Sequence, residues 1–585
     1  MLLVLTALFV TTACALVATG GFSATVAGVR FSAHSPLPAI TGAFVAFALW
    51  FIQAARARTF RTDLESAARW IDAHAGRLIA IIAALAAAVA IHFETYSASG
   101  SDASGYLSEA VMLSSGALSR IEPLGAIADW PHGAATLAPL GWVARSQVEQ
   151  VPTYAVGLPL LMALPHALGG VIGASIIVSL SAGLAVWFAG RLAMSFAGGA
   201  AGVLAAVWLA TLPIEIYESI QPMSDVPTTA AWLACWWWCA RTAEKGTVPF
   251  FESAIPLIAG IATGVAVLIR PNLAPLAVMP ALYLMTRRFS STRTRVAWMV
   301  AFAAPVAIAA ASVAVLQWRW FGSPLRSGYG TASEIYAMSN VGPNSGLYFK
   351  WLIDTHGPWL LAAPLVLVVA HRGVLRWMLA FAAAICLEYF FYAVFDGWPY
   401  LRFLLPALAI SAIAVSVLLA SVTWKLPHAG RGPVIIAIVL AVGTWQVVKA
   451  RELAVFRLAS RQARAALAGR YLEPVVRNDA VVLSGEQSGA IRYYTGRSIL
   501  RWDFLDEGAF RAAEERLISG HPDLWIVLDD WEAALFRDRF RGNAIGSLDW
   551  PPIVDAGDEG RTLAWRVRDR ERFMRGEHVV TDRVR

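Results

Sequence analysis

Long runs of apolar residues alternate with short polar connections from the N-terminus to about residue 448. A helix that crosses a bilayer needs about 20 apolar residues, and a pattern of repeated runs predicts a protein that crosses it many times. We expect about thirteen membrane-spanning helices. They are predicted at residues 1–20, 38–54, 78–93, 168–190, 199–214, 226–240, 254–269, 273–286, 296–317, 357–370, 376–395, 401–421 and 433–448.

The connections between these runs fall into two classes that alternate along the chain. One class is short and rich in arginine, at 55–77 and around Arg191, Arg241 and Arg287. Positive charge is retained on the cytoplasmic side, so these connections are predicted to be cytoplasmic. The other class is longer and richer in acidic and aromatic residues, and loops of this length usually carry function. We expect the functional groups in these outer connections, at 94–153, 215–225, 270–272, 318–356 and 396–400.

After the last apolar run the pattern becomes that of a water-soluble unit, residues 449–585. "DAVVLSG", "DLWIVLDD" and "TLAWRV" predict short buried strands, and "DEGAFRAAEERLIS" predicts an amphipathic helix. An odd number of spans from a cytoplasmic N-terminus places this small α/β domain on the outer side of the membrane. Because no GxGxxG or GxxxxGK[ST] motif is present, the sequence does not favour a nucleotide-binding fold.

Composition supports an integral membrane protein and removes several other classes. Of the 585 residues, 58% are hydrophobic and 15% charged, and the mean hydropathy is +0.58. Membrane topology explains the net charge of +7 better than nucleic-acid binding does. The four cysteines lie inside apolar runs, where they predict neither disulfides nor a metal site. No GxSxG or HExxH motif indicates a hydrolase or zinc protease.

Two aspartates lie at predicted outer ends of spans. Asp102 lies in "SASGSDASGYLSEA", with Tyr106 and Glu109 four and seven residues further along a predicted surface helix. Asp225 precedes Pro227 and an apolar helix. Each aspartate is either a helix N-cap or a functional carboxylate that acts as general base or metal ligand. Their position at one membrane face favours a shared site.

Two arginines occupy the same outer face, where the charge bias disfavours them. Arg270 lies in "GVAVLIRP" and Arg402 in "YLRFLLPAL". Each either extends to the interface or binds a lipid-linked phosphate, which suits the planar guanidinium. The glycine-rich loop that contains Tyr329 predicts a binding rim, although its tyrosines also suit a membrane interface. Glu388 is an acid inside a span, with a buried hydrogen bond as its alternative role.

The order of these features resembles the glycosyltransferase-C superfamily. The resemblance rests on an outer-loop Asp followed by Tyr, a second outer Asp before a helix, "GVAVLIRP" and "YLRFLLPAL". It is similar to the protein O-mannosyltransferase type, which includes lipid A aminoarabinose transferases and rhizobial lipopolysaccharide transferases. It implies a transmembrane catalytic core at 78–448, two additional N-terminal spans within 1–77, and the outer domain at 449–585.

The resemblance also implies roles for individual residues. Asp102 corresponds to the catalytic aspartate of the first outer loop, and Asp225 to the acid of the second. Tyr106, Arg270, Tyr329 and Arg402 are expected to bind substrate, the arginines at the polyprenyl phosphate. Relatives often carry a second acid directly after the first aspartate, where this chain has Ala103. The resemblance allows a Mg²⁺ or Mn²⁺ ion as a cofactor, but because of this departure it assigns no ligands to the ion.

The implied activity is transfer of a sugar from a polyprenyl-phosphate donor to an envelope lipid, polysaccharide or protein. The reaction is expected at the outer face of the inner membrane. A transporter or lipid-carrier flippase is the main alternative, but such proteins commonly show repeated halves and midplane sites, and neither is evident here. A structural or sensory protein whose outer domain binds a partner is the third class.

Overall fold

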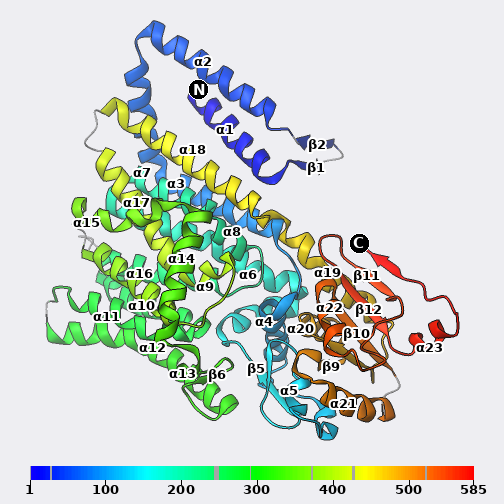
Figure 1. The fold of residues 1–585 in the computed structure, drawn as a ribbon. Coiled ribbons are helices and arrows are strands. Elements are labelled where there is room, and N and C mark those ends of the chain that lie inside the picture. The colour runs from blue at the N-terminus through cyan, green and yellow to red at the C-terminus, as the bar shows by residue number, and fades with distance from the viewer. Residues whose placement is uncertain are drawn as a thin grey trace.

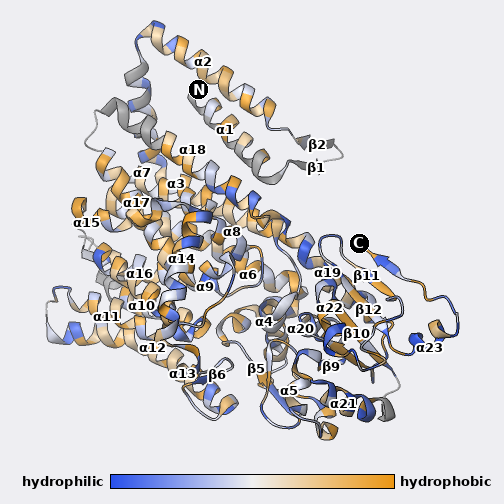
Figure 2. Ribbon diagram, in the orientation of Figure 1, coloured by the Kyte–Doolittle hydropathy of each residue, from blue (hydrophilic) through white to orange (hydrophobic). Residues whose placement is uncertain are grey.

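The computed structural model describes residues 2–26, 29–33, 35–242, 249–289, 291–370, 373–423, 428–520 and 523–585. Figure 1 shows a helical bundle, an N-terminal helix pair above it and a sheet-containing domain beside it. Figure 2 shows that apolar residues dominate the bundle, whereas polar and apolar residues mix in the domain. The chain is thus a helical, multi-pass membrane protein with an α/β unit after its last long helix.

Six of the described helices are long and apolar enough to cross a bilayer, or up to eight if each of two bent pairs counts as one span. The predicted total of about thirteen therefore stays a prediction. The six spans are Leu37–Ala57 (α2), Glu65–Phe93 within α3 (Phe60–Phe93), Gly157–Ala197 (α6), Thr292–Phe321 (α12), Gly373–Phe391 (α16) and Trp398–Thr423, which joins the 3-10 helix η5 (Trp398–Leu404) to α17 (Leu405–Thr423).

The remaining helices of the membrane part of the chain are not among these six spans. One bent pair joins α7 (Gly199–Thr211) to α8 (Pro213–Ser219) at 61°, and the other includes α14 (Val341–His356) and bends by 108° after it. Two predicted outer connections, 215–225 and 318–356, are therefore partly helical. The others are α1 (Leu2–Thr19), α9 (Asp225–Arg241), α10 (Pro249–Ile269), η2 (Pro271–Ala277), α11 (Val278–Met285), η4 (Pro358–Leu365), α15 (Val366–Val369) and α18 (His428–Glu452).

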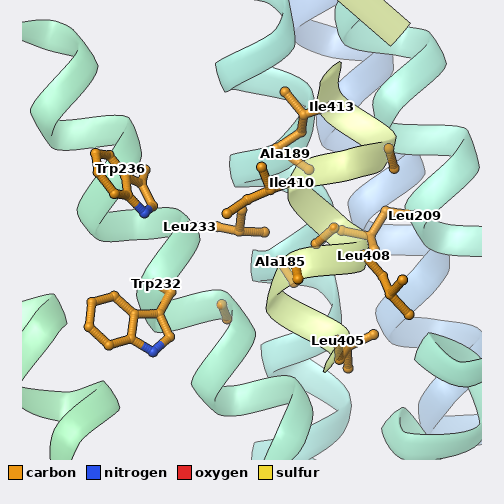
Figure 3. Close-up of a cluster of buried hydrophobic side chains, with 14 of the residues drawn as sticks. Ala185, Ala189, Leu209, Trp232, Leu233, Trp236, Leu405, Leu408, Ile410 and Ile413 are labelled. Atoms are coloured by element: carbon orange, nitrogen blue, oxygen red, sulfur yellow. The ribbon is translucent and has the colours of Figure 1, made fainter. Parts of the chain in front are cut away.

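Helix α17 forms the centre of the bundle, and 83% of its most apolar stretch is buried. Figure 3 shows its leucine and isoleucine side chains against α6, α7 and α9. Small residues such as Ala185 and Ala189 on α6 let the helices approach closely, which is how helices pack where lipid replaces water. Gly260 serves the same purpose on α10, because a Cβ there would lie 2.3 Å from the Phe302 carbonyl oxygen of α12.

The C-terminal domain contains a six-stranded sheet with the order β13-β11-β12-β10-β8-β9. Strands β8 (Val481–Ser484), β10 (Leu524–Asp529) and β12 (Thr562–Arg566) lie where the sequence predicts strands, and α21 (Glu507–Gly520) where it predicts a helix. The strands not predicted are β9 (Ser498–Arg501), β11 (Val554–Ala556) and β13 (Asp582–Val584). Three helices pack beside the sheet: α19 (Leu458–Leu472), α20 (Ser488–Thr495) and α22 (Asp530–Arg539).

The first outer connection joins the bundle to this domain. It contains α4 (Gly100–Ser114) and a small sheet of β3 (Arg120–Ile121), β4 (Trp142–Ala144) and β5 (Glu149–Pro152). Helix α20 lies directly on α4, since a Cβ on Gly489 would be 2.2 Å from Ser104 Oγ and 2.6 Å from the Leu140 carbonyl oxygen. The Ala98 amide donates to Tyr494 Oη at 3.0 Å. The domain is therefore fixed against the start of α4, where Asp102 lies.

Candidate active site

A cavity of about 580 Å³ opens where α4, η2 and η5 meet the C-terminal domain. Five of the six predicted site residues line it: Asp102, Tyr106, Arg270, Tyr329 and Arg402. The sixth, Asp225, lies directly behind Arg270 at the first position of α9. Residues up to 300 positions apart in the sequence are thus brought to one place, as the predicted common membrane face requires.

Asp102 and Arg402 form the first ion pair of this cavity. Arg402 Nη2 lies 2.8 Å from Asp102 Oδ2, and both side chains keep some exposure, 16% and 26%. Ser99 is the N-cap of α4, and Asp102 makes no capping hydrogen bond. The N-cap alternative for Asp102 is therefore wrong, because its carboxylate points to the arginine and the cavity instead.

Asp225 and Arg270 form the second ion pair, at 2.6 Å, and the Asp225 side chain is fully buried. Ser224 is the N-cap of α9, so Asp225 does not cap the helix either. Arg270 also donates from Nε to Ser224 Oγ at 3.2 Å and from Nη1 to Tyr389 Oη at 3.1 Å. Each arginine is thus mostly buried and held by an aspartate.

Tyrosines dominate the remaining wall of the cavity. Tyr106 donates to Ser224 Oγ at 3.0 Å, and its ring centroid lies 4.7 Å from that of Tyr154. Burial and the nearby Asp102 carboxylate raise the pKa of Tyr106, so that its hydroxyl stays protonated. Tyr329, from the loop between β6 (Arg326–Ser327) and β7 (Gly330–Thr331), closes the rim and is 55% exposed. The other tyrosines of the lining are Tyr217, Tyr389, Tyr392 and Tyr400.

Sequence reasoning missed several acids near this cavity. Glu215 and Glu218 of α8 are buried, and no carboxylate oxygen of either has a hydrogen-bond partner within the described residues. Two acids in "IEIYESI", three residues apart in a largely apolar stretch, are the signal that would have found them. Asp396 and Glu486 also line the cavity, and Glu486 comes from the C-terminal domain. No local motif marks Glu486, because only the docking of the domain places it here.

Two other acids considered from the sequence lie outside the cavity lining. Glu388 accepts hydrogen bonds from Asn272 Nδ2 at 3.0 Å and Tyr336 Oη at 3.2 Å, the buried role that was its alternative. Glu109 is fully buried on α4, and its two carboxylate oxygens have no hydrogen-bond partner in the part of the chain that is described. Burial raises the pKa of Glu109 well above its usual value.

The described residues contain no group of three or more His, Cys, Asp or Glu side chains that could hold a metal ion. One carboxylate oxygen of each aspartate in the predicted site pairs with an arginine. A requirement for Mg²⁺ or Mn²⁺ stays a prediction without assigned ligands among these residues.

No family model and no curated protein matches the chain. Solved structures do: ArnT from Cupriavidus metallidurans bound to undecaprenyl phosphate has a TM-score of 0.51 and 13% identity, covering 83% of this chain and 97% of ArnT. The apo state of the same protein has a TM-score of 0.51 and 12% identity, covering 83% of this chain and 97% of ArnT. An oligosaccharyltransferase from Archaeoglobus fulgidus, tethered to an acceptor peptide, has a TM-score of 0.49 and 13% identity, covering 83% of this chain and 73% of that protein.

The likeness to ArnT spans nearly the whole length of that protein. The chain therefore has the fold of ArnT, that of a polytopic helical membrane protein.

Proposed function

We propose that this chain, which shares the fold of ArnT, is a membrane glycosyltransferase that moves a sugar from a polyprenyl-phosphate carrier to an envelope acceptor. The observation that carries the proposal is the pair of Asp–Arg contacts at the wall of one cavity. An anion-binding group and a proton-accepting group at one place are what transfer from a lipid phosphate requires.

Arg270 and Arg402 bind the carrier phosphate in this proposal. Their side chains are only 13% and 16% exposed, and a guanidinium in a poorly hydrated wall binds phosphate oxygens strongly. The same guanidinium groups stabilise the negative charge that grows on the phosphate as the sugar leaves. The undecaprenyl phosphate bound to ArnT supports this choice of ligand.

Asp102 acts as the general base. As the acceptor oxygen or nitrogen attacks the anomeric carbon, Asp102 takes its proton, and the bond from that carbon to the phosphate oxygen breaks. The electron pair leaves with the polyprenyl phosphate. Asp102 suits this role because it is the more exposed of the two aspartates and faces the cavity, whereas Asp225 is sealed behind Arg270.

Asp225 holds Arg270 in place, and Tyr106 and Tyr329 contact the substrate. Tyr106 shares Ser224 with Arg270, so that the phosphate-binding group and the tyrosine wall are connected by hydrogen bonds. Tyr329 is the only one of the two that is largely exposed, which suits contact with a sugar entering from the rim.

The decisive experiment replaces Asp102 by Asn in the full chain. Asp102→Asn should abolish sugar transfer from the lipid carrier while undecaprenyl phosphate still binds, because the arginines remain. Arg270→Ala and Arg402→Ala should each weaken that binding. Asp354→Asn, an exposed acid of α14, is the matched control and should keep normal transfer. Normal turnover by Asp102→Asn would contradict the assignment of Asp102 as the general base.

We place the reaction at the outer face of the cytoplasmic membrane, with the C-terminal domain on that side and about thirteen spans in all. A flippase would use the same lipid but form no glycosidic product. Reconstituted vesicles separate the two classes, because an enzyme joins sugar to acceptor whereas a flippase only moves the carrier between leaflets.

A further inference from the structure

One carboxylate of the cavity belongs to the C-terminal domain and not to the membrane bundle. Glu486 follows β8 in the turn "SGEQSG" and lines the same cavity as Asp102 and Arg402. Its carboxylate lies close to the start of α4, since a Cβ on Gly100 would be 3.8 Å from Glu486 Oε1. Glu486 is exposed while its neighbours in the turn, Gly485 and Gln487, are buried. The turn therefore presents a single side chain to the cavity.

The backbone that carries Glu486 is held from three sides. Its amide donates to Glu532 Oε1 at 3.0 Å, and the same oxygen accepts from Trp502 Nε1 at 3.2 Å. On the other side, Gln487 accepts from the Gly100 amide at 3.3 Å and donates to Asp529 at 3.0 Å. These contacts fix the position of the turn relative to α4.

The Glu486 carboxylate itself has no hydrogen bond and no ion pair with any residue that the structure describes. Charged groups of both signs act on the Glu486 carboxylate: Asp529 and Asp102 repel it, and Arg464 and Arg501 attract it. Arg464 and Arg501 are themselves engaged by Asp529 and Asp503. A carboxylate on a fixed turn, facing a cavity and without a protein partner, is available to bind a ligand.

We propose that Glu486 is a substrate-binding residue that accepts hydrogen bonds from the hydroxyl groups of a sugar ring, so that the C-terminal domain completes the transfer site. This inference rests on the proposed function. A carboxylate has two acceptor oxygens and binds hydroxyl groups by charge-assisted hydrogen bonds. Seven tyrosines share the lining, and their rings and hydroxyls suit the faces and edges of a sugar. Hydroxyl-bearing rings come from the donor or from the acceptor, and the experiment separates these sources.

The test uses the purified full chain as wild type, Glu486→Ala, Glu486→Gln and Glu515→Gln. Glu515 is an exposed acid on α21 and serves as the matched control. Three quantities are measured: affinity for undecaprenyl phosphate without sugar, affinity for lipid-linked sugars extracted from native membranes, and the KM for acceptor membranes from cells that lack the protein. Charge-assisted hydrogen bonds predict a loss of about tenfold or more for Glu486→Ala.

A donor role predicts that Glu486→Ala weakens binding of the lipid-linked sugar, and an acceptor role predicts a higher acceptor KM. In both cases Glu486→Gln should be intermediate, because an amide keeps one acceptor oxygen, and affinity for the bare carrier should stay within twofold. Equal losses for Gln and Ala would indicate an ammonium ligand and overturn the inference. The inference would also be overturned if the wild type transfers sugar and the Glu486 variants match it in all three quantities. If the wild type itself transfers no sugar, the proposed function is refuted instead.

Discussion

The ion pair between Asp225 and Arg270 offers the sharpest test of the site's energetics. The change is Arg270→Met, which removes the guanidinium but keeps most of the volume of the side chain. Asp225 then remains as a fully buried carboxylate without the cation that lies 2.6 Å from it in the wild type. Breaking a buried pair in this way costs about 3–5 kcal/mol of unfolding free energy, because the remaining charge is uncompensated.

The double variant Asp225→Leu with Arg270→Met removes both charges together. Replacement of a buried pair by apolar residues is often neutral, so this variant should recover most of the lost stability. The interaction energy from the complete cycle should be about 3 kcal/mol. The Asp102–Arg402 pair should give a smaller interaction energy, because the Asp102 side chain is 26% exposed whereas that of Asp225 is fully buried.

Denaturant titration in detergent, followed by the fluorescence of the 24 tryptophans, measures these free energies. All four members of each cycle are compared at one detergent concentration and one pH. An Arg270→Met variant as stable as the wild type would refute the reasoning. Equal interaction energies for the two pairs would do the same, since the difference in burial is the whole basis of the expectation.

Two further predictions concern α4 and its contact with the domain. The raised pKa of Glu109 means that the folded state binds a proton more tightly than the unfolded chain, so stability falls as pH rises above the usual value of 4.5. Glu109→Gln should flatten that dependence in thermal unfolding measured between pH 4 and 8, and an unchanged slope would contradict it. Gly489→Ala should lower transfer severalfold, because its Cβ would lie 2.6 Å from the Leu140 carbonyl oxygen. Gly346→Ala, where a Cβ meets nothing within 4 Å, should transfer normally.

The grouping of the site residues could be predicted from the sequence, but their pairing could not. Alternation of basic and acidic connections was enough to assign Asp102, Asp225, Arg270 and Arg402 to one membrane face. Which arginine pairs with which aspartate depends on how η5 and η2 are set against α4 and α9, and that setting results from helix packing across the whole bundle. Hydropathy carries no such information.

The buried helix α8 and the position of Glu486 at the cavity could not be predicted from hydropathy either. The bend of 61° between α7 and α8 turns residues 213–219 out of line with the preceding helix, so a stretch expected as a loop forms a buried helix with two acids. Glu486 lies in a separate domain, almost 400 positions after Asp102 in the chain. Its approach to the cavity is produced by the contact of α20 with α4, which depends on Gly489 and Ser104 fitting together.

The two Asp–Arg pairs neutralise both guanidinium groups of the cavity wall, while Asp396 and Glu486 leave the wall with negative charge. Each pair can lie at the end of an apolar bundle without a loose counter-ion on its arginine. It also sets a threshold for entry, because an anion must displace a carboxylate that already lies 2.6 or 2.8 Å from each guanidinium. Under the proposed function, a small ion such as chloride fails that competition. A phosphate on a lipid tail succeeds because the membrane holds it at high local concentration. The site therefore selects anions that can displace the aspartate carboxylates from the arginines.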